Sequence, residues 1–232
     1  MPTNNPSFGD QVIAFNKQLE YTGNLPEGFA VINPFIENPE TIPTMERFYG
    51  KFYKDNKKRK FIIGINPSRH GAGITGVPFT DTKRLKNVCG IEMKTAYSHE
   101  PSSVYLYDVI EQYGGAHAFY RDFYINSPFP LAITRHNERN RWINANYYDD
   151  KSLFEAVKPF MVATLKNHLQ LPVDTSKVYV LGKKNAAYLE KINMEEQLFG
   201  ELVVLEHPRF IQQYKSREKS DYVLKYLKLL SI

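Results

Sequence analysis

Four short apolar runs, separated by longer amphipathic stretches, constrain the fold of this 232-residue chain more than any other feature. Each run is continuously apolar rather than alternating, which is typical of a strand buried on both faces. Strands that alternate with helices favour a parallel sheet covered by helices on both sides. We therefore expect an α/β fold, a three-layer α/β/α sandwich around a central, mainly parallel four-stranded sheet. The expected strands are 61–65, 123–126, 178–182 and 202–205.

The stretches between these runs predict helices at 102–113, 149–169, 184–192 and 220–230, and two more near the N-terminus at 7–21 and 43–53. Pro159 predicts that the helix over 149–169 is kinked or divided in two. Residues 22–37 are rich in Gly, Pro and Asn and are expected to be irregular. No internal repeat or long linker divides the chain. We expect one domain over 1–232, with 1–55 as a helical extension packed on it.

Composition excludes several classes of protein. Hydrophobic residues make up 42% and charged residues 24%, which is ordinary for a globular protein and excludes general disorder. Cys89 is the single cysteine, so an internal disulfide and a Cys₄ zinc or iron–sulfur site are excluded. The six histidines show no metal-ligand spacing. No metal or cofactor is expected. No apolar run is long enough for a membrane helix, and the polar N-terminus predicts a cytoplasmic protein without a membrane partner.

Positive charge is clustered although the net charge is only +5. Such clusters are usually solvated surface, and they indicate a nucleic-acid partner only if the fold gathers them on one face. The clusters are Lys57–Lys60; Arg135, Arg139 and Arg141 beside Trp142; Lys183–Lys184; and Arg209, Lys215, Arg217 and Lys219.

Polar residues follow each expected strand. In open α/β sheets, ligands bind beyond the carboxyl ends of the strands, so these positions are the candidate site. Asn66 follows the first strand, Asn126 ends the second, Lys183 follows the third and His207 follows the fourth. The first loop has glycines at 71, 73 and 76, which suit either a phosphate cradle or a tight turn. It has no P-loop ending and no dinucleotide-binding spacing.

These loops carry a family resemblance. Gly64-x-Asn66-Pro67, then Gly71, then the string 75–79 (Thr-Gly-Val-Pro-Phe), resembles motif 1 of the uracil-DNA glycosylase superfamily, most closely its single-strand-selective monofunctional (SMUG-type) branch. His207-Pro208 resembles motif 2, and Asn126 resembles the base-reading asparagine. The resemblance covers about two-thirds of the chain, from about Phe61 to about Lys215.

The resemblance implies a monofunctional DNA glycosylase that removes uracil or a related deaminated base in base excision repair. Asn66 would position the attacking water and His207 would stabilise the departing base. The other implied base-pocket residues are Gly64, Ile65, Phe79, which would stack on the base, Asn126 and Ser127. Implied DNA contacts are Lys183, Arg135, Arg139 and Arg141 at phosphates, and Arg209, Phe210 and Ile211 in the loop that wedges into the duplex.

The chain departs from the family pattern in two places. Arg69-His70 stands where motif 1 usually has proline and an aromatic residue, and Ala72-Gly73-Ile74 replaces larger residues. Smaller residues there predict a wider base pocket, with room for xanthine or other modified bases. The loop after His207-Pro208 also lacks the family's Ser-Pro-Arg pattern.

Three alternatives remain open from the sequence. The chain could be a catalytically inactive nucleic-acid-binding member of the same fold. It could act on free nucleosides, although the basic loops argue against this. A lyase that uses a lysine Schiff base is disfavoured, because no lysine lies at a nucleophile position of the matched motifs. The expected partner is DNA with a damaged base, single- or double-stranded, bound by a monomer.

Overall fold

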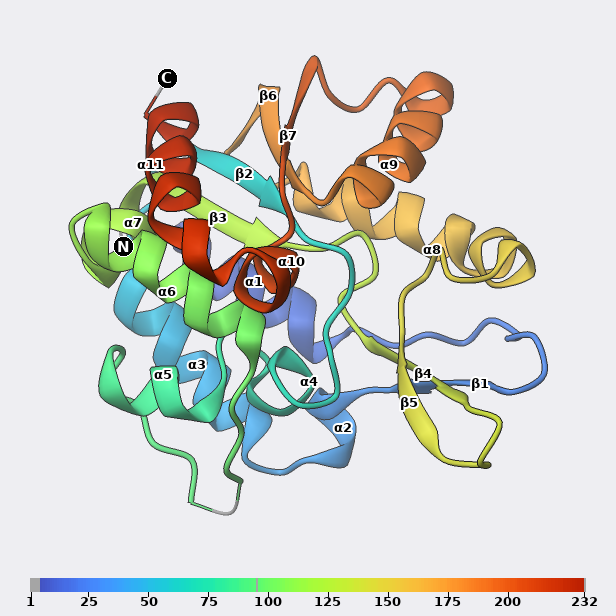
Figure 1. The fold of residues 1–232 in the computed structure, drawn as a ribbon. Helices are drawn as coiled ribbons and strands as arrows, with labels where there is room; N and C mark the ends of the chain where they lie inside the picture. Colours follow the sequence, from blue (N-terminus) through green and yellow to red (C-terminus); the bar gives the residue numbers. More distant parts are fainter. Residues whose placement is uncertain (1–4, 95, 232) are drawn as a thin grey trace.

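The computed structural model describes residues 5–94 and 96–231 (Figure 1). Its centre is a four-stranded sheet in the order β3-β2-β6-β7, and all three strand pairs are parallel. Ile63 pairs with Asn126 on one side and with Val180 on the other, so the carboxyl ends of these strands meet at one edge. The predicted parallel sheet is confirmed. Its strands are β2 (Arg59–Ile63), β3 (Phe123–Asn126), β6 (Val173–Leu181) and β7 (Glu201–Leu205).

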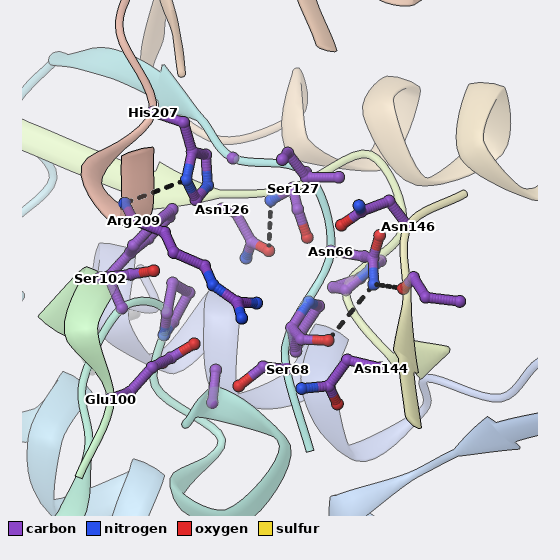
Figure 2. Close-up of a pocket in the computed structure, with 18 of the residues that line it drawn as sticks. Asn66, Ser68, Glu100, Ser102, Asn126, Ser127, Asn144, Asn146, His207 and Arg209 are labelled. Carbon is purple, nitrogen blue, oxygen red and sulfur yellow. Dashed lines mark hydrogen bonds between the residues drawn. The ribbon is translucent and has the colours of Figure 1, made fainter. Parts of the chain in front are cut away.

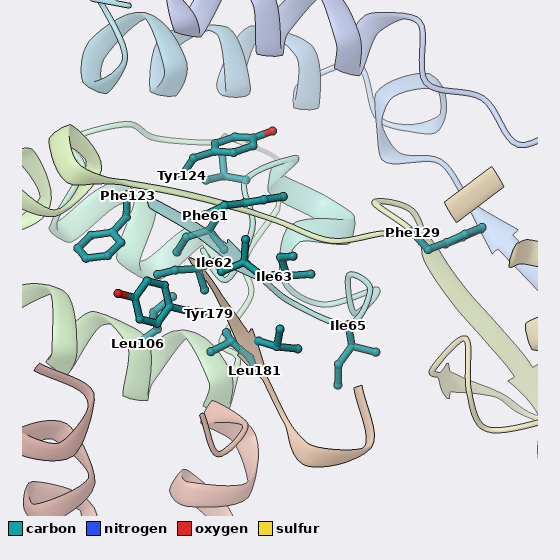
Figure 3. Close-up of a cluster of buried hydrophobic side chains, with 14 of the residues drawn as sticks. Phe61, Ile62, Ile63, Ile65, Leu106, Phe123, Tyr124, Phe129, Tyr179 and Leu181 are labelled. Atoms are coloured by element: carbon teal, nitrogen blue, oxygen red, sulfur yellow. The ribbon is translucent and has the colours of Figure 1, made fainter. Parts of the chain in front are cut away.

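Helices cover both faces of this sheet (Figure 3), so the predicted three-layer sandwich is confirmed. On one face, Phe8 packs against Tyr124 with ring centroids 5.0 Å apart, and His168 packs against Phe61. On the other face, Tyr105 packs against Tyr226. The first layer contains α1 (Phe8–Lys17), α3 (Thr41–Phe52) and α8 (Lys151–His168); the second contains α6 (Pro101–Gln112), α10 (Pro208–Tyr214) and α11 (Lys219–Leu230). Helix α9 (Lys183–Glu196) lies beside β6 and β7.

Local sequence sets the ends of these helices. Ser7 and Asp10 form a capping box at the start of α1, and Asp150 accepts hydrogen bonds from Ser152 N–H and Leu153 N–H at the start of α8. Helix α8 continues through Pro159 as one element. Of the two outcomes predicted for Pro159, division into two helices is therefore excluded.

A second, antiparallel sheet was not predicted. It has the order β1-β4-β5 and consists of β1 (Phe29–Ile32), β4 (Ala132–His136) and β5 (Trp142–Ala145). The expectation that 22–37 is irregular was wrong, because β1 and α2 (Pro34–Glu37) lie there. The N-terminal segment is thus not purely helical. Pairing of β1 with β4, from Phe29–Arg135 to Ile32–Ala132, gives this short strand the partner that its own sequence does not reveal.

The remaining elements are short: α4 (Ala72–Thr75), α5 (Thr82–Asn87), α7 (Ala116–Asp122) and a 3₁₀ turn at Ser216–Glu218. One cluster of buried hydrophobic side chains runs from Phe8 to Leu230 and includes residues of the N-terminal segment. Within the two described ranges, none of the helices combines the length and apolarity needed to span a membrane.

Candidate active site

A pocket of about 400 Å³ opens at the carboxyl ends of β2, β3 and β7 (Figure 2). Its walls come from the loop after β2, the residues after β3, the start of α10 and the segment after β5. The sheet therefore brings together the polar residues that follow three of the four expected strands. All seven predicted catalytic and base-binding residues line it: Gly64, Ile65, Asn66, Phe79, Asn126, Ser127 and His207.

Gly64 and Phe79 form one wall as a pair. A Cβ at Gly64 would come within 2.8 Å of Phe79 Cε2, so only glycine lets the ring lie this close to the strand end. Phe79 has a φ of 53°, a strained backbone conformation for an aromatic residue. Its ring lies 5.9 Å from the His207 ring, centroid to centroid. The surrounding structure holds Phe79 in this strained conformation, which keeps an aromatic face in the pocket, where a flat ligand can stack.

Backbone groups orient the Asn66 side chain. Its Nδ2 donates to the Ala145 carbonyl at 3.0 Å and to the Pro67 carbonyl at 3.3 Å. Its Oδ1 accepts from Tyr147 N–H at 3.1 Å. Both amide hydrogens are used, and Oδ1 keeps one lone pair. Asn66 is thus set to accept one further hydrogen bond, as from a water molecule.

Asn126 is oriented in a similar way. Its Oδ1 accepts from Ser127 N–H at 2.8 Å, and its Nδ2 donates to Tyr124 Oη at 2.7 Å. Tyr124 Oη lies 3.2 Å from His168 Nδ1, and burial lowers the pKa of His168 to about 3, so this histidine is neutral and can accept. Because Ser127 N–H can only donate, the amide cannot flip. One N–H and one lone pair of Asn126 remain for a ligand.

His207 caps α10 and is partly buried. Its Nδ1 accepts from Arg209 N–H at 3.2 Å, which places the proton of the neutral ring on Nε2. Burial, reinforced by the nearby Arg209 charge, lowers the pKa of His207 to about 4. The ring is therefore a neutral donor at physiological pH.

Glu100 is the single carboxyl among the described residues that line the pocket, and no sequence motif indicated it. It precedes α6, and a Cβ at Gly71 would come within 1.9 Å of Glu100 Oε2. Burial raises the pKa of Glu100, while hydrogen bonds from Ser68 and Ser103 and the charge of Arg209 act against this. Figure 2 shows its side chain on the same side of the pocket as the Arg209 guanidinium.

Asn16, Phe35 and Tyr49, from the N-terminal segment, also line the pocket. Gly76, in the loop after β2, packs closely against this N-terminal segment. It has a φ of +69°, and a Cβ there would come within 2.8 Å of both Thr41 and Phe35. No motif in residues 1–55 indicated this, because the contribution depends on packing between segments distant in sequence.

Asn144 and Asn146 are further lining residues that were missed. Asn144 Oδ1 accepts from Arg69 N–H at 3.1 Å. The spacing of two asparagines at i and i+2 was a usable signal for polar residues on one side of an extended segment. Ser102, Gln213 and Tyr214 also line the pocket and carried no comparable signal.

The predicted wedge residues have different environments. Phe210 is 43% exposed at the pocket mouth, with its ring 5.8 Å from that of Tyr214. Arg209 also lines the mouth. Ile211 has no exposed surface, so its assignment as a DNA contact was wrong: it is a core residue that anchors α10.

The other predicted DNA contacts do not line the pocket. Arg135, Arg139 and Arg141 lie exposed on the β4–β5 hairpin, and Lys183 is exposed at the start of α9. The Lys57–Lys60 cluster lies at the amino end of β2, away from the pocket edge, and Arg59 within it is buried against Tyr53 and Phe8. The fold thus brings only part of the positive charge toward the site.

Among residues 5–94 and 96–231, no group of three or more His, Cys, Asp or Glu side chains could hold a metal ion. The groups available in the pocket are amides, hydroxyls, one carboxyl, one neutral imidazole and one guanidinium. Such a set can bind a planar polar ligand, orient water and stabilise a developing anion.

Comparison with known proteins agrees with this site. The sequence model of the Uracil DNA glycosylase superfamily matches residues 51–231, and the chain belongs to that superfamily. A crystal structure of wild-type SMUG2 from Pedobacter heparinus is similar, with 46% sequence identity, 97% coverage of each chain and a TM-score of 0.94. This likeness supports the SMUG-type branch. No curated protein matches the chain significantly.

Proposed function

We propose that the chain is a monofunctional DNA glycosylase that hydrolyses the N-glycosidic bond of uracil, or of a related deaminated base, in DNA. The observation that carries the proposal is the placement of Asn66 and His207 on two walls of one pocket, each oriented by backbone partners (Figure 2). Membership of the superfamily and the similarity to SMUG2 support the same class of reaction.

The reaction needs a nucleotide flipped out of the stack and into the pocket. The bond between C1′ and the base nitrogen breaks, and its electron pair leaves with the base. A bond from a water oxygen to C1′ forms, and the proton that this water loses passes through solvent to the departed base anion, so the products are a sugar hydroxyl and the free base. Positive charge develops on the sugar and negative charge on the base.

Asn66 suits the positioning of this water. A water that donates to the free lone pair of Oδ1 directs its own lone pair away from the amide, toward the sugar. An amide is not a useful general base, so the contribution of Asn66 is placement. The described lining residues include no lysine, and an amine nucleophile is not available from them.

The His207 and Asn126 side chains suit hydrogen bonding to the flipped base. The Nε2–H of neutral His207 donates to a carbonyl oxygen as negative charge collects there. The free N–H and lone pair of Asn126 match a carbonyl oxygen next to a ring N–H, the edge that uracil presents. Cytosine presents an amino group and a bare ring nitrogen there, so the oriented amide disfavours it.

An excision assay tests the proposal. Labelled oligonucleotides would carry one uracil, hypoxanthine or xanthine, single-stranded and opposite each base, and would be incubated with protein without added metal. The expected result is strand breakage at the modified base only after alkali treatment, with uracil among the substrates. Folded protein that binds DNA and produces no alkali-sensitive site would contradict the proposal and favour a catalytically inactive binding protein.

A further inference from the structure

The β4–β5 hairpin presents an exposed aromatic pair next to the pocket. Trp142 is 42% exposed, and its ring centroid lies 3.9 Å from that of His136, its direct cross-strand partner. Both side chains lie on the same face of the hairpin, because directly opposite residues of an antiparallel pair share a face. In Figure 1 the hairpin extends away from the central sheet.

This face continues into the pocket wall. Side chains of a strand alternate between faces, so Trp142 and Asn144 point to the same side of β5. Asn144 lines the pocket and bonds to the loop after β2. Two residue steps separate them, about 7 Å along a strand. The aromatic pair is therefore placed to meet a nucleotide close to the one in the pocket.

The hairpin also carries net positive charge, since its three arginines outnumber its one carboxylate, Glu138. Arg139 and Arg141 are exposed, and neither forms an ion pair with any residue in 5–94 or 96–231. Asn137 Oδ1 accepts from the N–H groups of both arginines at 3.0 Å, which holds the turn in one shape. Free guanidinium groups beside an exposed aromatic face suit a strand with phosphates and accessible bases.

We propose that Trp142, supported by His136, is a stacking platform for an unpaired base of single-stranded DNA that flanks the flipped nucleotide, and that Arg139 and Arg141 hold phosphates of the same strand. The inference rests on the proposed function, since the pocket supplies the neighbouring nucleotide. A duplex keeps its bases stacked and offers no free face to the ring. The hairpin therefore favours single-stranded over double-stranded substrate.

Trp142 is the single tryptophan of the chain, so its fluorescence reports directly on the hairpin. The protein would be titrated with a uracil-free single-stranded oligonucleotide and with the duplex of the same sequence, while anisotropy of a labelled strand reports total binding. We expect quenching of the tryptophan by the single strand and little change with the duplex. Binding of the single strand without quenching would overturn the proposal.

Variants separate stacking from folding. Trp142→Ala should weaken single-strand binding about tenfold and duplex binding less than twofold, whereas Trp142→Phe should retain most of the affinity. Tyr97→Ala, which removes another exposed aromatic ring outside the pocket lining, should change neither the single-strand affinity nor the duplex affinity. If Trp142→Ala lost affinity equally for single strand and duplex, with an unchanged melting temperature, the stacking proposal would also be overturned. Failure of wild-type excision with quenching intact would refute the glycosylase activity and leave the platform standing.

Discussion

At the scale of single residues, backbone groups determine what each polar side chain in the pocket can do. Tyr147 N–H and the Ala145 carbonyl orient Asn66, and Ser127 N–H orients Asn126. Arg209 N–H selects the ring tautomer of His207. Because backbone N–H groups donate only and carbonyls accept only, these orientations are fixed before a ligand arrives. Such preorganisation is the main source of electrostatic catalysis in this type of site.

The lowered pKa of His207 gives a pH prediction. With a pKa of about 4 instead of 6.5, the ring stays neutral over the physiological range, and it gains a proton only as the pH falls toward 4. The single-turnover rate constant of excision should therefore show no inflection between pH 8 and about 5 from this group. A pH–rate profile of the wild type tests this, and an inflection near 6.5 that disappears in His207→Gln would contradict it.

The carboxyl of Glu100 gives a prediction about affinity. Its negative charge opposes DNA phosphates and balances Arg209, so Glu100→Gln should tighten DNA binding about two- to fivefold. Since the pKa of Glu100 is raised, lowering the pH protonates the wild-type carboxyl earlier than an ordinary glutamate, and the difference between the two proteins should shrink. Anisotropy titrations at several pH values measure this. Weaker DNA binding by Glu100→Gln would contradict the expected repulsion between the Glu100 carboxylate and DNA phosphates.

At the level of secondary-structure elements, the first turn of α9 joins the ends of β2 and β6 to the segment after β5. Asn185, fully buried, donates from Nδ2 to the Gly64 and Leu181 carbonyls, both at 3.1 Å. Its Oδ1 accepts from Tyr147 Oη at 2.5 Å. Tyr147 in turn holds Asn66 through its backbone N–H. The position of the Asn66 amide thus depends on four elements: the ends of β2 and β6, helix α9 and the segment after β5.

This connection predicts the effect of Tyr147→Phe. Loss of the hydroxyl leaves Asn185 Oδ1 buried without its donor, which costs about 1–3 kcal/mol of stability. The same change loosens Tyr147, so the excision rate should fall about tenfold while the dissociation constant for DNA stays the same. Tyr179→Phe is the matched control, because its buried hydroxyl has no hydrogen-bond partner in the described chain. Single-turnover kinetics and melting curves test this, and equal rates for the two variants would contradict it.

Elements with strong local patterns could be predicted from the sequence, and those that depend on a distant partner could not. The apolar run 123–126 corresponds to β3, residue for residue. Strands β4 and β5 were missed because β4 ends in the polar pair Arg135-His136 and β5 is only four residues long. Strand β1 lies in a Gly/Pro/Asn-rich stretch whose pattern is that of a loop. Its pairing with β4 connects residues about 100 positions apart.

At the scale of the whole molecule, charge is distributed unevenly around the pocket. Positive side chains follow the carboxyl ends of three strands: the hairpin arginines at and after the end of β4, Lys183 after β6 and Arg209 after β7. Lys57 and Lys58, in contrast, lie just before the amino end of β2. The modest net charge of +5 therefore understates the positive charge available to a nucleic acid.

This distribution predicts that the salt dependence of DNA binding changes when hairpin arginines are replaced, but not when lysines before β2 are replaced. The logarithm of the binding constant for single-stranded DNA should fall linearly with the logarithm of salt concentration. Arg139→Gln combined with Arg141→Gln should reduce that slope by about 1.4, at roughly 0.7 per phosphate contact. Lys57→Gln combined with Lys58→Gln should leave it unchanged. Equal slope changes for the two pairs would contradict the assignment of the hairpin to the DNA-binding face.

The candidate site was predictable where a strand end supplied it. Asn66, Asn126 and His207 follow strands with clear apolar patterns, and parallel strands place their carboxyl ends together. Asn16 and Tyr49 were not predictable, because only tertiary packing carries residues 8–52 to the pocket. Ile211 was misassigned since adjacent residues of a short helix differ in burial, and a motif in sequence does not distinguish them.

The role proposed for Asn66 is tested by comparing Asn66→Ala with wild type in a single-turnover excision assay on a uracil-containing single strand, with DNA binding measured in parallel. If Asn66 places the water, the rate constant should fall at least about 100-fold while the dissociation constant changes less than about threefold. Excision at the wild-type rate by folded Asn66→Ala protein would contradict the assignment of Asn66 as the residue that places the attacking water.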